Sequence, residues 1–216
     1  MIRILVVDDH DLVRTGLSTM LQDVEDFEVV AQGADGEEGI KLARELEPDV
    51  VLMDVKMPGM GGLEATSKIL HYLPDISVIG VSACDEAVFA KQLMEGGAKG
   101  YVTKGAAIDE VIEAVRSVKT GKPYMSSKIA QELALLQVSK GADSSPFAKL
   151  SQREMQTAMM IANGKRAQEI ADTFNVSSKT VNSYRYRIFD KLKINSDVEL
   201  TLMMVKHNIL DPESMI

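Results

Sequence analysis

Five polar side chains close apolar runs of the sequence, and these are the residues of the chain best suited to chemistry. Asp8 and Asp9 end IRILVVDD, Asp54 ends VVLMD, Ser82 ends VIGVS and Lys104 ends GYVTK. Short runs rich in Val, Ile and Leu are typical of strands buried on both faces of a parallel sheet. Ligands of open α/β sheets bind just beyond the carboxyl ends of the strands. Three carboxylates, a hydroxyl and an ammonium group meeting there predict a site for Mg²⁺ and for a phosphoryl group carried by an aspartate.

Strand and helix patterns alternate regularly through the first half of the chain. We expect strands near residues 2–8, 28–32, 49–53, 77–81 and 100–103. We expect helices near residues 12–22, 36–46, 62–72, 86–96 and 106–120. Five strand–helix repeats predict an α/β fold, a five-stranded, doubly wound parallel sheet with helices on both faces.

Helical patterns without strands fill the second half of the chain. A short helix near 127–137 is followed by VSKGADSSP, a small and polar stretch typical of a linker. Four further helices are expected near 151–163, 167–174, 178–192 and 197–207. The predicted domains are an α/β domain over 1–122, a linker with a short helix over 123–146, and an all-α domain over 147–211.

Charge is distributed unevenly between these domains. Residues 1–124 carry 12 basic and 22 acidic side chains, whereas residues 147–216 carry 10 basic and 8 acidic ones. Within the second domain, residues 177–193 hold five basic side chains against one acidic side chain. An acidic first half and a locally basic second half indicate two domains with different partners.

Bulk properties favour a cytoplasmic protein without a membrane partner. No apolar stretch approaches the length that crosses a bilayer, and the first residues lack the pattern of a signal peptide. The single cysteine, Cys84, rules out an internal disulfide framework and fits a reducing compartment. The histidines His10, His71 and His207 show no metal-ligand spacing.

The segments VVDDH, LMDVKMPGMGG, GVSA and GYVTKG resemble, in order and spacing, the signature of two-component response-regulator receiver domains. The resemblance covers the α/β domain. It implies that Asp54 accepts a phosphoryl group from a sensor histidine kinase. It also implies that Asp9 and Asp54 hold Mg²⁺ directly, that Asp8 holds it through a water, and that the backbone carbonyl of Lys56 completes the set.

The same resemblance gives roles to three further residues. Lys104 would pair with the phosphoryl oxygens, and the Ser82 hydroxyl would donate a hydrogen bond to them. In the family this hydroxyl moves toward the phosphoryl group while an aromatic side chain on the last strand turns inward, and Tyr101 occupies that position. The alternatives are that Tyr101 is a half-exposed strand aromatic, that Lys104 is a solvated loop residue, and that the Asp pair only caps a helix.

The strings LSQREMQ and ANGKRAQEIADTFNVSSKTVNSYRYRIFDKL resemble the C-terminal helix-turn-helix module of NarL/FixJ (LuxR-type) regulators. Ser177 or Ser178 is expected to cap the second helix of the motif, whose first half would enter the major groove. The resemblance implies base contacts from Asn182, Ser183 and Tyr186. The side chains expected mainly to contact phosphate are Lys179, Thr180, Arg185, Arg187 and Lys191.

The string VNSYRYR resembles the GacA/UvrY subgroup, which includes SirA and VarA. That resemblance implies a sensor kinase of the BarA/GacS type and the activation of small regulatory RNAs that sequester the translational repressor CsrA/RsmA. The last helix, near 197–207, has an apolar face that could pack internally or pair with a second copy. The resemblance implies that it joins two copies on a two-fold promoter site. We therefore expect a phosphorylation-switched transcription regulator and no enzyme.

Two other functions fit part of the pattern. An aspartyl-nucleophile, Mg²⁺-dependent phosphatase of the haloacid-dehalogenase kind needs a second aspartate two residues after the nucleophile, where this chain has Lys56. A regulator switched by a small apolar ligand needs a sensor domain without the acid triad. Both are disfavoured. The sequence leaves open the operator, the cognate kinase, the phosphoryl lifetime, and whether phosphorylation acts through dimerisation or through release of the DNA-binding domain.

Overall fold

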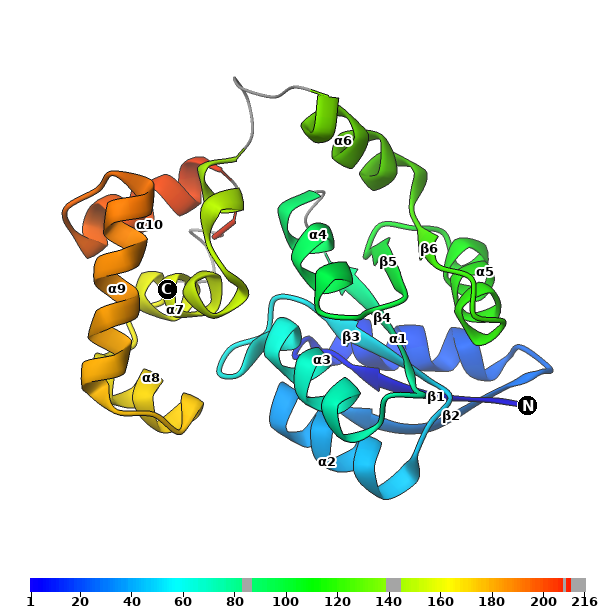
Figure 1. The fold of residues 1–216 in the computed structure, drawn as a ribbon. Coiled ribbons are helices and arrows are strands. Elements are labelled where there is room, and N and C mark those ends of the chain that lie inside the picture. Colours follow the sequence, from blue (N-terminus) through cyan, green and yellow to red (C-terminus); the bar gives the residue numbers. More distant parts are fainter. Residues whose placement is uncertain (83–86, 139–144, 208, 211–216) are drawn as a thin grey trace. The chain divides into compact units, whose positions relative to one another are not determined.

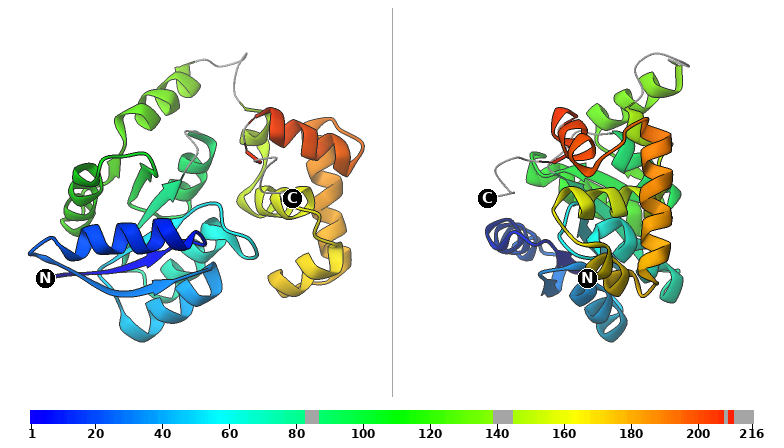
Figure 2. Two further views of the ribbon diagram at one scale, coloured as in Figure 1. Left: turned by 180° about the vertical axis from the view of Figure 1, so that it is seen from behind. Right: turned by 90° about the vertical axis from the view of Figure 1, so that its left-hand side faces the viewer.

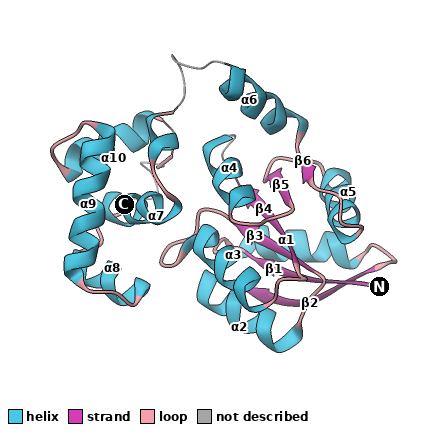
Figure 3. Ribbon diagram, viewed as in Figure 1, coloured by secondary structure: helices cyan, strands magenta, loops and turns pink. Residues whose placement is uncertain are grey.

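The computed structural model describes residues 1–82, 87–138, 145–207 and 209–210, with backbone only for 135–138. Within these residues the chain forms two compact units, Met1–Leu135 and Leu136–Ile216 (Figure 1). Strands and helices alternate in the first unit, and the second is built from helices (Figure 3). Cys84 and part of the predicted linker lie outside the described residues.

The first unit is an α/β domain around a parallel sheet of six strands in the order β2-β1-β3-β4-β5-β6. The strands are β1 (Ile2–Val7), β2 (Phe27–Gly33), β3 (Val50–Asp54), β4 (Ser77–Ser82), β5 (Gly100–Thr103) and β6 (Tyr124–Met125). The doubly wound parallel sheet is confirmed, but it has a sixth strand that the sequence analysis did not predict. A strand of two residues is too short for a periodic pattern. Hydrogen bonds to neighbouring backbone define it, from Tyr124 N to Lys99 O at 3.0 Å and from Ser126 N to Tyr101 O at 3.1 Å.

Helices cover both faces of this sheet. The helices are α1 (Asp11–Gln22), α2 (Gly36–Leu46), α3 (Gly61–Tyr72), α4 (Ala87–Glu95), α5 (Ile108–Lys119) and α6 (Ser127–Val138). Helices α1 and α5 lie on one face, and α2, α3 and α4 lie on the other (Figures 1 and 2). Every residue of β3 and β4 is buried. Burial on both faces explains why these strands are unbroken apolar runs that end in polar residues.

The second unit contains a 3-10 turn, η1 (Pro146–Lys149), and four helices: α7 (Gln152–Ala162), α8 (Ala167–Phe174), α9 (Ser178–Leu192) and α10 (Asp197–Lys206). Helices α8 and α9 form the helix-turn-helix. Asn175 ends α8 in the left-handed conformation, with φ of 55°. The Ser177 hydroxyl accepts a hydrogen bond from Thr180 N at 3.1 Å, so Ser177, and not Ser178, caps α9. Ile170, Phe174 and Val181 are core residues of the motif.

No helix among the described residues is both long enough and apolar enough to cross a membrane.

Candidate functional site

Carboxylates from two neighbouring strand ends meet at the carboxyl edge of the sheet. Strands β1 and β3 pair through Val7 and Met53, so Asp8 and Asp54 follow side by side. One ligand atom from each of Asp8, Asp9, His10 and Asp54 lies within 4.8 Å of the others. Asp8 and Asp54 are 2% and 1% exposed. An acidic cluster of this composition is typical of metal-binding phosphorylation sites, since hard divalent cations prefer oxygen ligands.

Lys104 joins the two buried carboxylates of this cluster. Its Nζ lies 2.8 Å from Asp8 Oδ2 and 2.7 Å from Asp54 Oδ2. The Lys104 backbone N–H donates to the carbonyl of Ser82 at 2.8 Å, which fixes the end of β5 against the end of β4. The alternative of a solvated loop lysine is therefore wrong, because the ammonium group is mostly buried.

Burial and neighbouring charges set the ionisation of the site. Burial raises the pKa of Asp54 to about 6, opposed by the ammonium of Lys104 and aided by the carboxylate of Asp8. Burial alone would lower the pKa of Lys104, but Asp54 and Asp8 raise it overall. At neutral pH the Asp54 side chain is therefore mainly the carboxylate, while Lys104 remains protonated.

The backbone around Asp54 is fixed by close contacts. The Lys56 N–H donates to Asp54 Oδ1 at 3.0 Å. Gly62, in the first turn of α3, donates from its N–H to the carbonyl of Val55 at 3.2 Å. A Cβ on Gly62 would lie 1.9 Å from the Asp54 carbonyl oxygen, so only glycine allows α3 to approach the strand this closely.

Ser82 and Tyr101 lie on adjacent strands and are both fully buried. Ser82 pairs with Thr103, and Gly80 pairs with Tyr101 across β4 and β5. Because Gly80 has no side chain, the Tyr101 ring and the Leu93 side chain fill the space above it. The alternative of a half-exposed strand aromatic at position 101 is therefore wrong.

Two side chains of the cluster were not predicted from the sequence. His10 Nδ1 lies 2.9 Å from Asp9 Oδ1 and 3.4 Å from Asp8 Oδ1, although the histidine spacing had indicated no metal site. Arg14, one turn into α1, donates from Nη1 to the Asp8 carbonyl at 2.7 Å. The only signal in the sequence is that α1 starts directly after the Asp pair, which brings its first turn beside the strand end.

Helix α9 presents to solvent a polar face that carries two basic side chains. Lys179, Ser183, Tyr186 and Arg187 are exposed, and Tyr186 is 72% exposed. Asn182 is half-buried beside them. These residues recur at three- and four-residue spacings, which place them along one side of a helix.

Three other side chains predicted to contact DNA form ion pairs or hydrogen bonds with other side chains of the unit. Lys191 Nζ lies 2.5 Å from Glu154 Oε2, and Arg185 Nη2 lies 2.6 Å from Asp197 Oδ2. The Thr180 hydroxyl lies 2.9 Å from the Ser177 hydroxyl. The acidic partners of Arg185 and Lys191 lie on other helices, α10 and α7, so the sequence of α9 alone does not distinguish these two basic residues from its exposed ones.

Comparison with known proteins assigns both units. Residues 4–116 match the response regulator receiver domain family. Residues 148–204 match the family of bacterial regulatory proteins called the luxR family. The chain belongs to the response regulators with a LuxR-type DNA-binding domain. This is a family of two-component regulators rather than of catalytic enzymes.

Individual relatives agree with this assignment over the full length of the response regulator. This chain is 56% identical over 214 residues to response regulator GacA of Pseudomonas aeruginosa, and the match covers 99% of this chain and all of that one. It is 46% identical over 215 residues to response regulator UvrY of Escherichia coli, covering all of this chain and 99% of that one. The solved structure of RcsB from Salmonella enterica bound to a promoter has a TM-score of 0.76 at 21% identity, covering 94% of this chain and 98% of that one. That likeness supports the two-part fold.

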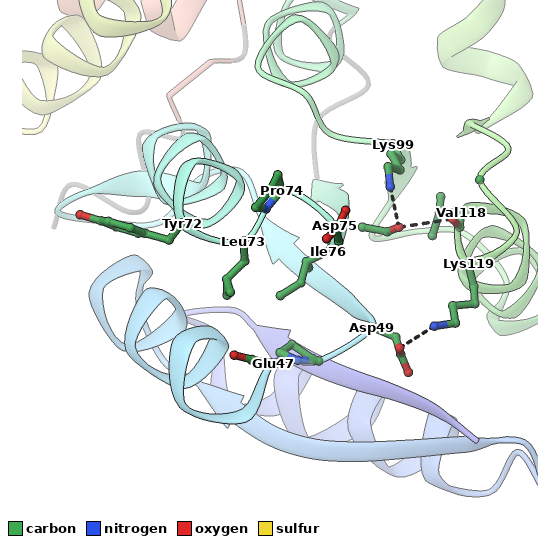
Figure 4. Close-up of a pocket in the computed structure, with 13 residues that line it drawn as sticks. Glu47, Asp49, Tyr72, Leu73, Pro74, Asp75, Ile76, Lys99, Val118 and Lys119 are labelled. Carbon is green, nitrogen blue, oxygen red and sulfur yellow. Dashed lines mark hydrogen bonds and ion pairs between the residues drawn. The ribbon is translucent and has the colours of Figure 1, made fainter.

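A cavity of about 540 Å³ lies at the opposite edge of the receiver sheet in this response regulator, where β3 and β4 begin (Figure 4). Polar contacts cross its lining, from Lys119 to Asp49 at 2.5 Å and from Lys99 to the Ser77 hydroxyl at 3.3 Å. Its lining residues come mainly from the segments that lead into β3, β4 and β5 and from the ends of α3 and α5. The cavity is therefore separate from the acidic cluster at the carboxyl ends of the strands.

Proposed function

We propose that Asp54 is the phosphoacceptor and that Mg²⁺ is the metal of the acidic cluster. The observation that carries the proposal is the buried pairing of Lys104 with Asp8 and Asp54, at 2.8 and 2.7 Å. A buried ammonium group at this point is placed to neutralise an incoming phosphoryl group. Asp9 and Asp54 would ligate Mg²⁺ directly, Asp8 would act through a water, and the backbone carbonyl of Lys56 would complete the set.

Phosphoryl transfer requires an ionised nucleophile, and Asp54 is mainly ionised above pH 6. One of its carboxylate oxygens forms the new bond to phosphorus while the bond to the kinase histidine breaks, and the histidine nitrogen keeps that electron pair. Positioning and charge neutralisation provide most of the catalysis in such transfers. Bound Mg²⁺ would neutralise part of the charge on the phosphoryl oxygens. Lys104 would exchange a carboxylate partner for a phosphoryl oxygen. The donor is a sensor histidine kinase of the BarA/GacS type.

Ser82 and Tyr101 form the switch in this proposal. A phosphoryl group adds nearly two negative charges and strong acceptors, to which the Ser82 hydroxyl would donate. Tyr101 lies inward in the structure. Phosphorylation would therefore stabilise a position that this ring already adopts, shifting a population of two states.

The sixth strand gives this switch a route out of the receiver. Ser126 N donates to the Tyr101 carbonyl, and Ser126 Oγ donates to Glu110 Oε1 on α5 at 2.5 Å. Helix α6 begins at the next residue. A shift of β5 at Tyr101 would thus act on the segment that leads toward the DNA-binding unit.

The output of the switch is DNA binding by α9. Asn182, Ser183 and Tyr186 would meet base edges in the major groove, while Lys179 and Arg187 would contact phosphates. Thr180, Arg185 and Lys191 are weaker candidates for phosphate contacts because each is already bonded to another side chain of the unit. We propose a homodimer on DNA, formed through the exposed apolar side chains of α10. By likeness to the GacA/UvrY subgroup, its targets are promoters of small regulatory RNAs that antagonise CsrA/RsmA.

Intact-mass analysis after incubation with acetyl phosphate tests the phosphoacceptor. We expect the full chain to gain one phosphoryl group in Mg²⁺ and none after Mg²⁺ is removed with EDTA. Asp54→Asn should gain none, whereas the matched control Asp109→Asn, in the first turn of α5, should gain one. A gain that persists in Asp54→Asn would place the acceptor elsewhere.

A further inference from the structure

Arg185 of α9 and Asp197 of α10 form an ion pair within the DNA-binding unit. Arg185 Nη2 lies 2.6 Å from Asp197 Oδ2, and the guanidinium carbon lies 5.4 Å from the centre of the Phe189 ring. The sequence analysis expected this arginine to contact a DNA phosphate. In the structure its charge is directed to another helix of the same unit.

The contact between the two side chains is partly buried, and each side chain is partly exposed. Arg185 and Asp197 are 39% and 42% exposed. Arg185 Nε and Asp197 Oδ1 are nevertheless buried, without another hydrogen-bond partner in the described part of the chain. Two such atoms would be costly to bury without a nearby opposite charge, so each charged group stabilises the other in place.

The position of Arg185 on the helix explains its direction. It lies four residues after Val181 and three before Ile188, both of which are core residues on the inner side of α9. Side chains at these spacings share one side of a helix. Arg185 is therefore next to the core and beside α10, whereas Arg187 lies with the exposed residues.

Asp197 is well placed to hold this arginine. It is the first residue of α10, after the Ser196 cap, where the helix dipole favours a negative charge. Leu200 and Met204 anchor α10 in the core, while Val198 and Leu202 are 68% and 64% exposed. The ion pair thus connects the recognition helix to the helix whose apolar face we assign to dimer contact.

We propose that Asp197 is a positioning residue for α9, and that Arg185 acts on Asp197 rather than on a DNA phosphate. The inference rests on DNA binding by α9. The pair would fix the angle between α9 and α10, and in a dimer joined through α10 this angle sets the separation of the two recognition helices.

The test compares Arg185→Met, Asp197→Asn and the double variant in the full chain, on a duplex that the wild type enriches from a random library. Each single change should weaken binding by roughly three- to tenfold, and the double variant should bind no more weakly than either. The salt dependence should stay as in wild type. Binding should also become less sensitive to one- or two-base-pair changes in half-site spacing. Asp197→Glu should retain binding.

Arg187→Met is the matched control, because Arg187 is exposed on the same helix. Its log–log salt slope should fall in magnitude by about one, as for a lost phosphate contact. The inference is overturned if Asp197→Asn tightens DNA binding while Arg185→Met, like Arg187→Met, reduces the magnitude of the salt slope by about one. That result would identify Arg185 as a phosphate contact that Asp197 partly neutralises.

A wild-type chain that enriches no duplex would refute DNA binding itself, and then the ion pair is measured by urea unfolding. The urea midpoint of the second unit should fall in each single variant and fall no further in the double variant. Additive effects would overturn the proposed coupling.

Discussion

Asp54 is a buried acid with one hydrogen-bonded cation, and this combination decides its properties. Its Oδ2 meets Lys104, and its Oδ1 accepts from the Lys56 N–H. Burial nevertheless raises its pKa to about 6, because it outweighs these favourable contacts. The folded receiver therefore favours the protonated acid more strongly than the unfolded chain does.

Asp54→Asn should stabilise the receiver at neutral pH without Mg²⁺. The folded-state pKa lies above the ordinary aspartate value of 3.8, so the carboxylate destabilises the fold increasingly as the pH rises from about 4 to 6. The gain in unfolding free energy should be about 1–3 kcal/mol at pH 7 and vanish below pH 4. Urea unfolding between pH 4 and 8 measures it.

Asp49→Asn is a control of opposite sign. Burial would raise the Asp49 pKa, but hydrogen bonds from Arg3 N and Lys119 lower it overall. The Asp49 carboxylate therefore stabilises the fold at pH values above 3.8, and this stabilisation is lost as the pH falls through its folded-state pKa. This variant should therefore be less stable than wild type at pH 7. Equal stability of Asp54→Asn and wild type at that pH would contradict the assigned cost of burying Asp54.

Gly62→Ala should damage the proposed phosphorylation site through the backbone. The added Cβ would lie 1.9 Å from the Asp54 carbonyl, so α3 and the end of β3 must separate. We expect a loss of about 1–3 kcal/mol in unfolding free energy and slower uptake of phosphate from acetyl phosphate. Gly16→Ala, in open space on α1, should instead be neutral or stabilising. Wild-type uptake in Gly62→Ala would show that the close approach is not needed.

Sequence reasoning reached the acidic site at the residue scale because strand ends converge in a parallel sheet. Asp8, Asp54 and Lys104 were placed together by this rule alone, and the structure brings them together. The rule gives no account of contacts between helices. Arg185 was thus counted with the DNA contacts, although Asp197 lies 12 residues away and beside it in space.

At the scale of elements, β6 was missed because its two residues carry no pattern of their own. It forms because β5 would otherwise be an edge strand with unpaired backbone N–H and C=O groups, and β6 pairs with them. Its pairing gives residues after the last receiver helix a direct contact with the backbone of Tyr101. The long strands and helices, by contrast, followed from periodicity, since burial on one or two faces dictates their side chains.

Ser126→Pro tests whether β6 transmits the switch. Proline removes the N–H that donates to the Tyr101 carbonyl, but it is tolerated just before a helix begins. We expect normal phosphate uptake at Asp54 and a smaller difference in DNA affinity between the phosphorylated and unphosphorylated forms. Ser126→Ala, which keeps the N–H and loses only the hydroxyl contact with Glu110, is the matched control. If the phosphorylated and unphosphorylated forms of Ser126→Pro differ in DNA affinity as much as those of the wild type, β6 does not transmit the switch.

Helices α7 and α9 are joined by a buried acid. Burial of Glu154 acts to raise its pKa, but hydrogen bonds from Lys191 and from Ser151 lower it overall. Because its folded-state pKa is lowered, the Glu154 carboxylate stabilises the fold at pH values above its unfolded pKa near 4.5. This stabilisation is lost as the pH falls through the folded-state pKa. Glu154→Gln should therefore destabilise the second unit at pH 7 and should reduce its loss of stability on acidification. Thermal unfolding at pH 3 to 7 measures both; an unchanged acid profile would contradict this role.

At the scale of the whole molecule, the chain joins an acidic receiver to a unit with a basic recognition helix. The receiver holds a buried charge cluster, which we propose to be the site of phosphorylation, and the second unit holds an exposed polar helix face. Regulated DNA binding requires both units. In the proposed mechanism the two units are coupled by a free energy, the amount by which phosphorylation of the receiver changes the free energy of DNA binding. A tenfold change in DNA affinity corresponds to about 1.4 kcal/mol.

The most direct test of this linkage measures DNA affinity and phosphorylation in one sample. The full chain is treated with acetyl phosphate and Mg²⁺, phosphorylation of Asp54 is quantified by intact mass, and binding to its enriched duplex is followed by fluorescence anisotropy. We predict that affinity rises about tenfold or more with phosphorylation of Asp54 in the wild type, and stays constant in Asp54→Asn. Equal affinities of the fully phosphorylated and unphosphorylated wild type would contradict a phosphorylation-switched DNA-binding regulator.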